Sequence, residues 1–337
     1  MRDSKEQPEF VILIPVFNDW DAVSVVLQDL DRALSKRNLR ADVLLVDDAS
    51  TTQYSRQALA TGRSAISRSR VLQLSRNLGH QRAIAVGLTY LHENRPYRGV
   101  IIMDGDGEDD PRDVPRLLDE FERHDGQKCV FAERVRRSEG FVFSSFYLLY
   151  RILHYVLTGQ RIRIGNFSVV PFSMLRRLVV VSELWNHYAA AVVHAGFPLT
   201  TVPTTRTKRI AGKSNMNFVS LVVHGLSAMS VYADIIGVRL LVAALGFIGL
   251  TVIGLAIVIG LRIATDLAIP GWATYTAGIM LVILAQVVTM SLIFALISLS
   301  RRQASTFLPV RDCYHFVYTV EEILPETCAT TDTAAPS

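Results

Sequence analysis

Short apolar runs that end abruptly in polar residues recur through the first part of the chain. They cover residues 10–15, 100–103 and 129–132, with two largely apolar stretches at 41–46 and 70–74 and helix-like spacing in several of the intervening stretches. Continuous apolar runs of this length are typical of strands buried on both faces, as in a parallel sheet. The repeat of strand, polar turn and helix predicts an α/β domain with a mostly parallel sheet.

The polar residues after these runs are expected to meet at one edge of the sheet, because ligands of open α/β sheets bind at the carboxyl ends of the strands. Asp104 and Asp106, separated by one glycine, suit a shared hard cation such as Mg²⁺. A solvated acidic turn would explain one such strand end but not all of them. The strand-end set is Asp19, Asp47, Asp48, Arg76, Asn77, Asp104 and Asp106.

The middle of the chain offers further polar segments. Residues 162–171 are expected to form a strand interrupted by a turn at Gly165-Asn166, and residues 183–195 a helix. A basic loop follows, with cations from Arg206 to Lys213. Such a loop beside an acidic metal site fits a polyphosphate lying between them, whereas a solvated basic face is the alternative. No G-x-G-x-x-G follows the first run, which disfavours a dehydrogenase.

The C-terminal third has a different character. Half of the residues are hydrophobic, and the excess lies after Gly237, in uncharged runs at 240–261 and 273–299. Each run is long enough to span a bilayer, although two buried helices of a soluble protein are the alternative. Arg239, Arg301 and Arg302 flank one side of the pair, which by the positive-inside rule predicts that both termini and the α/β domain are cytoplasmic.

Three further features bear on membrane contact, self-association and nucleic-acid binding. Residues 141–157 are apolar and aromatic, which fits a helix on the membrane surface or, alternatively, a core helix. Gly246, Gly249 and Gly254 offer a small-residue face through which two copies could associate. The net charge of +4 is modest and contains no long basic arm, so a nucleic-acid partner is not expected, whereas anionic lipid would suit it.

Five segments together resemble family 2 glycosyltransferases. They read FVILIPVFND, LLVDDAS, SRNLGHQRA, IIMDGDGEDDP and the basic stretch from Arg209 to Ser214. More narrowly, over residues 10–300 the chain is similar to polyprenyl-phosphate glycosyltransferases, relatives of dolichol-phosphate mannose synthase. The resemblance implies a type A glycosyltransferase domain, Rossmann-like with a mostly parallel sheet, followed by a two-helix transmembrane hairpin.

The resemblance also implies roles for particular residues. Asp104 and Asp106 match the motif that holds Mg²⁺ or Mn²⁺ on the donor diphosphate, and Asp106, Arg209 and Lys213 would be catalytic. The substrate-binding residues would be Pro15, Asp19, Asp47, Asp48, Arg76, Asn77, Arg134, Asn166 and Ser214. Asn166 departs from the family, which often has aspartate there, so catalysis is expected to depend on electrostatics and not on a base at this position.

The expected protein is therefore an inverting, metal-dependent enzyme of a bacterial inner membrane, which transfers a sugar from a UDP- or GDP-sugar to a polyprenyl phosphate. A diacylglycerol or lipid-linked sugar acceptor and a non-catalytic nucleotide-sugar-binding protein are the alternatives. Residues 1–233 would form the catalytic domain, with interfacial helices at 141–157 and 215–235. Residues 238–300 would hold the two spans, and 301–337 a cytoplasmic tail with a disordered end.

Overall fold

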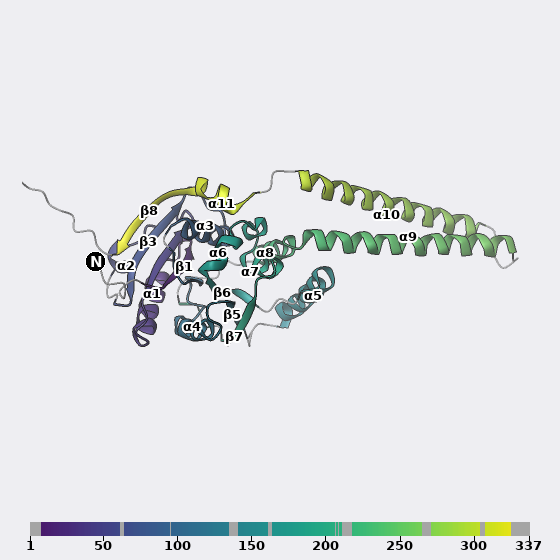
Figure 1. Cartoon of the computed structure of the whole chain (residues 1–337). Coiled ribbons are helices and arrows are strands. Elements are labelled where there is room, and N and C mark those ends of the chain that lie inside the picture. Colours follow the sequence, from purple (N-terminus) through teal and green to yellow (C-terminus); the bar gives the residue numbers. More distant parts are fainter. Residues whose placement is uncertain are drawn as a thin grey trace, which may run out of the picture. The chain divides into compact units, whose positions relative to one another are not determined.

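A mixed β-sheet forms the centre of the first structural unit of the chain (Figure 1). The computed structural model describes residues 8–60, 64–94, 96–134, 141–160, 164–205, 207, 209–210, 218–264, 271–303 and 307–324. Within these residues the sheet has eight strands in the order β7-β5-β6-β4-β1-β2-β3-β8. Its first four strands in sequence are β1 (Phe10–Val16), β2 (Ala41–Asp47), β3 (Ile66–Leu74) and β4 (Gly99–Ile102).

These four strands are mutually parallel neighbours, so their carboxyl ends lie at one edge, as predicted. The apolar run of β1 is explained by its two faces. Ile12 and Ile14 point into one core, with α1 (Trp20–Ser35) and α4 (Val114–Arg123). Val11 and Leu13 point into the other core, with α3 (His80–Glu93). A strand covered on both faces is expected to be apolar at nearly every position.

The remaining strands are β5 (Cys129–Arg134), β6 (Ile164–Pro171), β7 (Leu199–Thr204) and β8 (Val317–Leu324). β6 runs antiparallel between β4 and β5, and β8 runs antiparallel along β3. The expected turn at Gly165-Asn166 is wrong, because both residues lie inside β6. Pairing with β4 and β5, and burial of Phe167 and Val169, outweigh the local turn preference of a Gly-Asn pair.

The helix expected over residues 183–195 is divided. A 3₁₀ turn, η2 (Ser182–Trp185), is followed by α7 (Tyr188–His194). His187 separates them and caps α7, because its Nδ1 accepts a hydrogen bond from Ala190 N at 3.3 Å. The other short elements of this unit are α2 (Arg56–Ala60), η1 (Pro111–Asp113), α6 (Phe172–Leu178) and α8 (Phe218–Ser230).

The C-terminal residues return to the sheet. After α11 (Pro309–Asp312) and η3 (Cys313–Phe316), β8 pairs with β3. The rings of Phe307 and Phe316 lie 4.1 and 5.4 Å from that of Trp185, centroid to centroid. Residues 307–324 therefore form part of the first unit.

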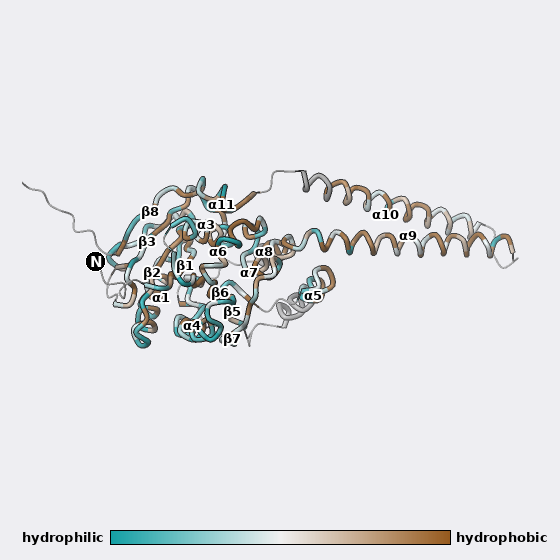
Figure 2. Tube along the Cα trace, in the orientation of Figure 1, coloured by the Kyte–Doolittle hydropathy of each residue, from teal (hydrophilic) through white to brown (hydrophobic). Residues whose placement is uncertain are grey.

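The second unit comprises residues 145–161 and 232–306. It holds most of α5 (Phe141–Thr158), together with α9 (Ala233–Ala264) and α10 (Trp272–Gln303). Residues 233–264 and 272–297 are long and apolar enough to cross a membrane, and within them 18-residue stretches reach mean hydropathies of 2.7 and 2.6. Figure 2 shows the apolar colouring along both helices. Gly254 faces Met280 of α10, so this glycine serves the packing of the pair itself.

Candidate active site

The acidic turn after β4, residues 104–110, is held by hydrogen bonds from its own backbone, one of them to a buried carboxylate. Asp109 is 5% exposed, and its Oδ2 accepts a hydrogen bond from Asp104 N at 3.0 Å. Asp106 Oδ1 accepts one from Glu108 N, also at 3.0 Å. Gly105 lies so close to α1 and β1 that a Cβ atom there would come within 2.9 Å of Val23 Cγ2 in α1 and 3.0 Å of Ile14 Cγ2 in β1. The sequence Asp-Gly-Asp therefore places its two carboxylates at the sheet edge because the residue between them has no side chain.

Asp104 and Asp106 each face a cationic or ionisable side chain. Asp104 Oδ1 lies 3.1 Å from His80 Nε2, at the start of α3. Asp106 Oδ2 lies 3.6 Å from Arg209, whose other terminal nitrogen is 2.6 Å from Asp19 Oδ2. Partial burial opposes the protonated imidazole, but the charges of Asp104, Asp106 and Asp109 outweigh it and raise the pKa of His80.

A chain of amides connects His80 to the protein interior. Tyr188 N–H can only donate, and it donates to Gln81 Oε1 at 2.8 Å. Gln81 Nε2 therefore faces Asn166 Oδ1, at 3.1 Å, and Asn166 Nδ2 faces His80 Nε2, at 3.0 Å. His80 Nε2 can accept from Asn166 or donate to Asp104, but it cannot do both at once. The site thus offers the imidazole two exclusive hydrogen-bonding states.

The acid pair after β2 has a different environment. Asp48 is 3% exposed, and its carboxylate accepts hydrogen bonds from Leu78 N at 2.6 Å and Gly79 N at 2.8 Å. Asp47 Oδ1 accepts one from Ser50 N at 2.9 Å. Burial raises the pKa of Asp48, and the two backbone hydrogen bonds partly offset this effect. Asp48 therefore anchors the loop that leads into His80.

The other predicted site residues divide into three groups. Pro15 is buried within β1, beside the site, and its side chain has no polar group. Arg76 lies over the ring of Phe316, at 5.6 Å from its centroid, and Asn77 is exposed in the same loop. The side chain of Arg134 and all of Lys213 and Ser214 lie outside the described residues.

The donor set fits a divalent cation of a particular kind. Among the residues that the structure describes, no group of three or more His, Cys, Asp or Glu side chains is spaced to enclose a metal ion. Two carboxylates one residue apart nevertheless match the usual Mg²⁺ arrangement, in which substrate phosphates and water complete the coordination. Asp104 and Asp106 would therefore hold a metal together with a bound diphosphate and not as a closed protein cage.

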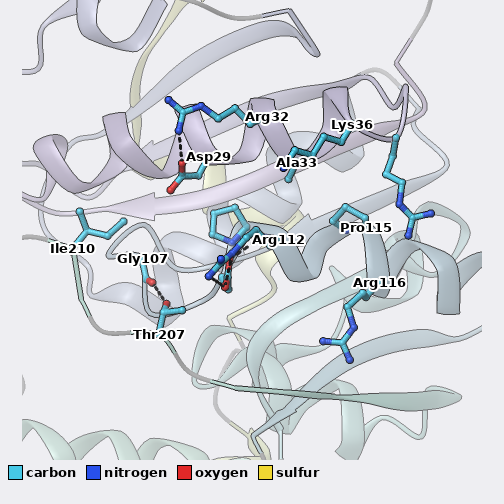
Figure 3. A pocket seen from close by; sticks show the side chains of 13 residues that line it. Asp29, Arg32, Ala33, Lys36, Gly107, Arg112, Pro115, Arg116, Thr207 and Ile210 are labelled. Atoms are coloured by element: carbon cyan, nitrogen blue, oxygen red, sulfur yellow. Dashed lines mark hydrogen bonds and ion pairs between the residues drawn. The ribbon is translucent and has the colours of Figure 1, made fainter.

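A cavity of about 670 Å³ lies against the acidic turn, on the side of α1 and α4 (Figure 3). Its wall includes Gly107 of the acidic turn, and Thr207 and Ile210 of the segment that carries Arg209. Most of its basic side chains face acids, as in the pairs Arg32–Asp29 at 3.1 Å and Arg116–Asp113 at 2.5 Å. These exposed pairs largely balance the charge of the lining, so the cavity is not a concentrated anion site.

Three residues of the site were missed in the sequence. His80 and Gln81 stand in the quoted segment SRNLGHQRA, where only Arg76 and Asn77 were selected. The signal was the position of His80 directly after Gly79, at the start of α3. Thr207 was the third, and nothing in its local sequence distinguishes it from its neighbours. Its importance depends on a contact with residues 107 and 108, about one hundred positions earlier.

Sequence comparison agrees with this architecture. A model described as Glycosyl transferase family 2 matches residues 11–185, which include β1, the acidic turn, His80 and Asn166. The fold and the strand-edge site thus define a glycosyltransferase of the type A class. The chain belongs to glycosyl transferase family 2.

Three relatives illustrate the range of similarity. The chain is 25% identical to the uncharacterized glycosyltransferase YkcC of Bacillus subtilis, over 79% of this chain and 81% of that protein. It is 26% identical to a dodecaprenyl-phosphate galacturonate synthase of Rhizobium johnstonii, over 62% and 60%. It is 22% identical to an undecaprenyl-phosphate 4-deoxy-4-formamido-L-arabinose transferase of Klebsiella pneumoniae, over 63% and 63%. The chain therefore spans less than two thirds of the second and third relatives.

Proposed function

We propose that this glycosyltransferase moves a sugar from a UDP- or GDP-sugar to a polyprenyl phosphate, with inversion, at the cytoplasmic face of a bacterial inner membrane. The observation that carries the proposal is the acidic turn at the sheet edge, with Arg209 against it, in a family 2 chain. The names of two relatives, which specify dodecaprenyl and undecaprenyl phosphate, support the acceptor class.

The residues of the acidic turn would bind the donor through its diphosphate. Asp104 and Asp106 would hold a divalent cation, Mg²⁺ or Mn²⁺, which supplies positive charge against the departing diphosphate. Arg209 lies within reach of Asp106 and can pair with the same phosphates. Lys213 and Ser214, which follow in the same basic stretch, are proposed to complete this contact. Stabilising the leaving group is the largest demand of the step.

The acceptor needs little help from a base. A phosphate monoester has a second pKa of about 6, so its oxygen is largely anionic at neutral pH. That oxygen attacks the anomeric carbon, the bond from this carbon to the diphosphate oxygen breaks, and no proton has to be removed from a dianion. Asn166, held by Gln81, is proposed to orient His80 beside the reacting groups. Asp19, Asp47, Asp48, Arg76, Asn77 and Arg134 are proposed to border the nucleotide directly or through their loops.

Chain connectivity supports a membrane hairpin. The residues before α9 and those after α10 belong to one structural unit, and β8 pairs with β3 within its sheet. A chain that leaves and re-enters one folded unit must cross a bilayer an even number of times, which fits the two apolar helices. The side chains of Ile152, Leu153 and Val156 on α5 are 46–62% exposed, as expected for a helix against lipid headgroups.

The proposal is tested with the full-length protein in detergent. Labelled UDP- and GDP-sugars are incubated with undecaprenyl phosphate or diacylglycerol, with Mg²⁺ or with EDTA. A labelled lipid that retains a negative charge on anion exchange, formed only with metal and undecaprenyl phosphate, is the expected product. A neutral product made from diacylglycerol would contradict the proposed acceptor, and equal transfer in EDTA would contradict the metal.

A further inference from the structure

The segment that carries Arg209 is fastened to the acidic turn on both sides of that residue. Ile210 N donates to Asp106 O at 3.1 Å, and Thr207 N donates to Glu108 O at 3.1 Å. The hydroxyl of Thr207 also donates to Gly107 O, a contact visible in Figure 3. Backbone bonds at residues 207 and 210 leave the Arg209 backbone little freedom to move away from the turn.

Close packing strengthens this attachment. Gly107 has φ +82°, and a Cβ atom built there would collide with the Ile210 side chain. A glycine is therefore required at this position, both for the backbone conformation and for the approach of Ile210. The Asp-Gly-Asp-Gly sequence thus provides two carboxylates and also the backbone against which Thr207 and Ile210 pack.

From this anchored position Arg209 reaches across the sheet edge. Its guanidinium is 2.6 Å from Asp19 Oδ2, after β1, and 3.6 Å from Asp106 Oδ2, after the neighbouring β4. The side chain is only 18% exposed, as is that of Asp106. A partly buried guanidinium between two carboxylates stabilises their charge more strongly than an exposed surface pair does. The carboxylate of Asp106 therefore already faces a cation, the guanidinium of Arg209.

We infer that Arg209 competes with the divalent cation for Asp106 and thereby makes metal binding depend on the donor diphosphate. This inference rests on the proposed function, because it concerns the same metal and donor. A metal ion alone would have to approach Asp106 against the charge of the guanidinium. A diphosphate offers the guanidinium a bidentate oxyanion, so Arg209 can turn to it without losing a partner. Metal and diphosphate then each favour the binding of the other.

The expected signature is thermodynamic coupling. If a nucleoside diphosphate increases the affinity for metal by some factor, the metal increases the affinity for the nucleotide by the same factor. Part of that factor should disappear when the guanidinium is removed. The backbone hydrogen bonds of Thr207 and Ile210 stay in place when the diphosphate binds, so only the Arg209 side chain has to reorient.

The experiment measures Mn²⁺ binding by the full-length protein in detergent, from the electron paramagnetic resonance signal of free Mn²⁺, with and without UDP or GDP. In the wild type we expect weak binding of Mn²⁺ alone and binding at least about tenfold tighter with nucleotide, as for an ordinary coupling of ligands. In Arg209→Met we expect Mn²⁺ alone to bind at least about fivefold tighter than in the wild type, and the nucleotide effect to shrink.

Two further variants distinguish the loss of positive charge at position 209 from a general disturbance of the loop. Arg32→Met removes an exposed guanidinium that pairs with Asp29, and it should bind Mn²⁺ as the wild type does. Arg209→Lys keeps a positive charge and should remain close to the wild type. Equal or weaker Mn²⁺ binding in Arg209→Met, or tight binding in Arg209→Lys, would overturn the inference. Absence of Mn²⁺ binding in every protein would also overturn it, whereas the acceptor assay tests the proposed function independently.

Discussion

Two acidic pairs lie at the same edge of the sheet, and their carboxylates have different partners. Asp47 and Asp48, after β2, are 7% and 3% exposed and accept hydrogen bonds from backbone N–H groups. Asp104 and Asp106, after β4, have side chains about one fifth exposed and face His80 and Arg209. Side-chain cations can be exchanged for a ligand, whereas backbone N–H groups cannot leave without opening a loop. The second pair is therefore the one suited to bind a ligand.

The largest effect is expected at Asp106. Asp106→Ala should lower transfer by at least about 10³-fold, because it removes a charge that faces the donor diphosphate and its metal. Asp106→Asn should be almost as inactive, although it keeps an oxygen for the hydrogen bond from Glu108 N. Initial rates of sugar transfer at saturating Mg²⁺ measure both, and thermal unfolding provides the control for folding.

The expected melting temperature of Asp106→Asn is close to that of the wild type. Transfer by Asp106→Ala within tenfold of the wild-type rate at ordinary metal concentrations would be incompatible with a metal role for this residue. The two acidic pairs would then not be functionally distinct, and the contrast in their partners would be only structural.

The opposite pattern is expected at Asp48. Asp48→Ala leaves Leu78 N and Gly79 N without their carboxylate partner, and an unsatisfied buried donor costs about 1–3 kcal/mol. We expect the free energy of unfolding to fall by about 2–4 kcal/mol, since relief from burying a charge offsets part of the loss. Thermal or denaturant unfolding measures this change.

Asp47→Ala is the matched control, because Asp47 has one such bond, to Ser50 N, and should lose less stability. If Asp48→Ala instead melted like the wild type and lost affinity for the nucleotide, Asp48 would be a direct ligand contact. That result would remove the distinction between the two pairs.

The sequence was informative where burial alone decides structure. The apolar runs of β1 and β4, and the largely apolar run of β2, predicted parallel strands, because a strand covered on both faces needs such a run. It could not separate Asp48 from Asp104, since both are acids at strand ends. The difference depends on which backbone N–H groups the loop before His80 presents. Such loop geometry has no local signature.

Long-range contacts explain the other errors. Gly165-Asn166 was expected to form a turn, but pairing with β4 and β5 keeps it in β6. His80 was overlooked because its partners, Asp104 and Asn166, are far from it in sequence. The orientation of the Asn166 amide follows from its contact with Gln81, which Tyr188 N fixes in turn, and it could not be inferred from the replacement of an aspartate by asparagine.

A moderate effect is expected at Asn166. Asn166→Ala removes the amide between Gln81 and His80 while leaving Asp104 and Asp106 unchanged. We expect KM to rise and kcat to fall by less than about tenfold, because an orienting group is lost but no charge that stabilises the leaving group. Steady-state kinetics with varied donor and acceptor measure this.

Ser168→Ala, in the same strand, is the control, since Ser168 bonds to Asn166 O and to the Tyr188 hydroxyl and does not touch His80. A loss as large as that of Asp106→Ala would instead show that Asn166 takes part in the chemical step.

The smallest effect is expected from His80, and it depends on pH. The folded protein raises the pKa of His80, so in metal-free protein the imidazole contributes stability that is fully present below its unfolded pKa of about 6.5. This contribution is lost as the pH rises through the raised folded value. The melting temperature of His80→Gln should therefore fall further below that of the wild type in acidic than in alkaline buffer, measured in EDTA. A difference that did not change with pH would mean that Nε2 accepts from Asn166 throughout, and that Asp104 is charged without an imidazolium beside it.

Added Mg²⁺ should make the stability difference between His80→Gln and the wild type in acidic buffer smaller, because a metal ion on Asp104 offsets the negative charge that favours the protonated ring. Asp104 would then resemble Asp106, since at each of the two carboxylates a side-chain cation and a metal ion would compete.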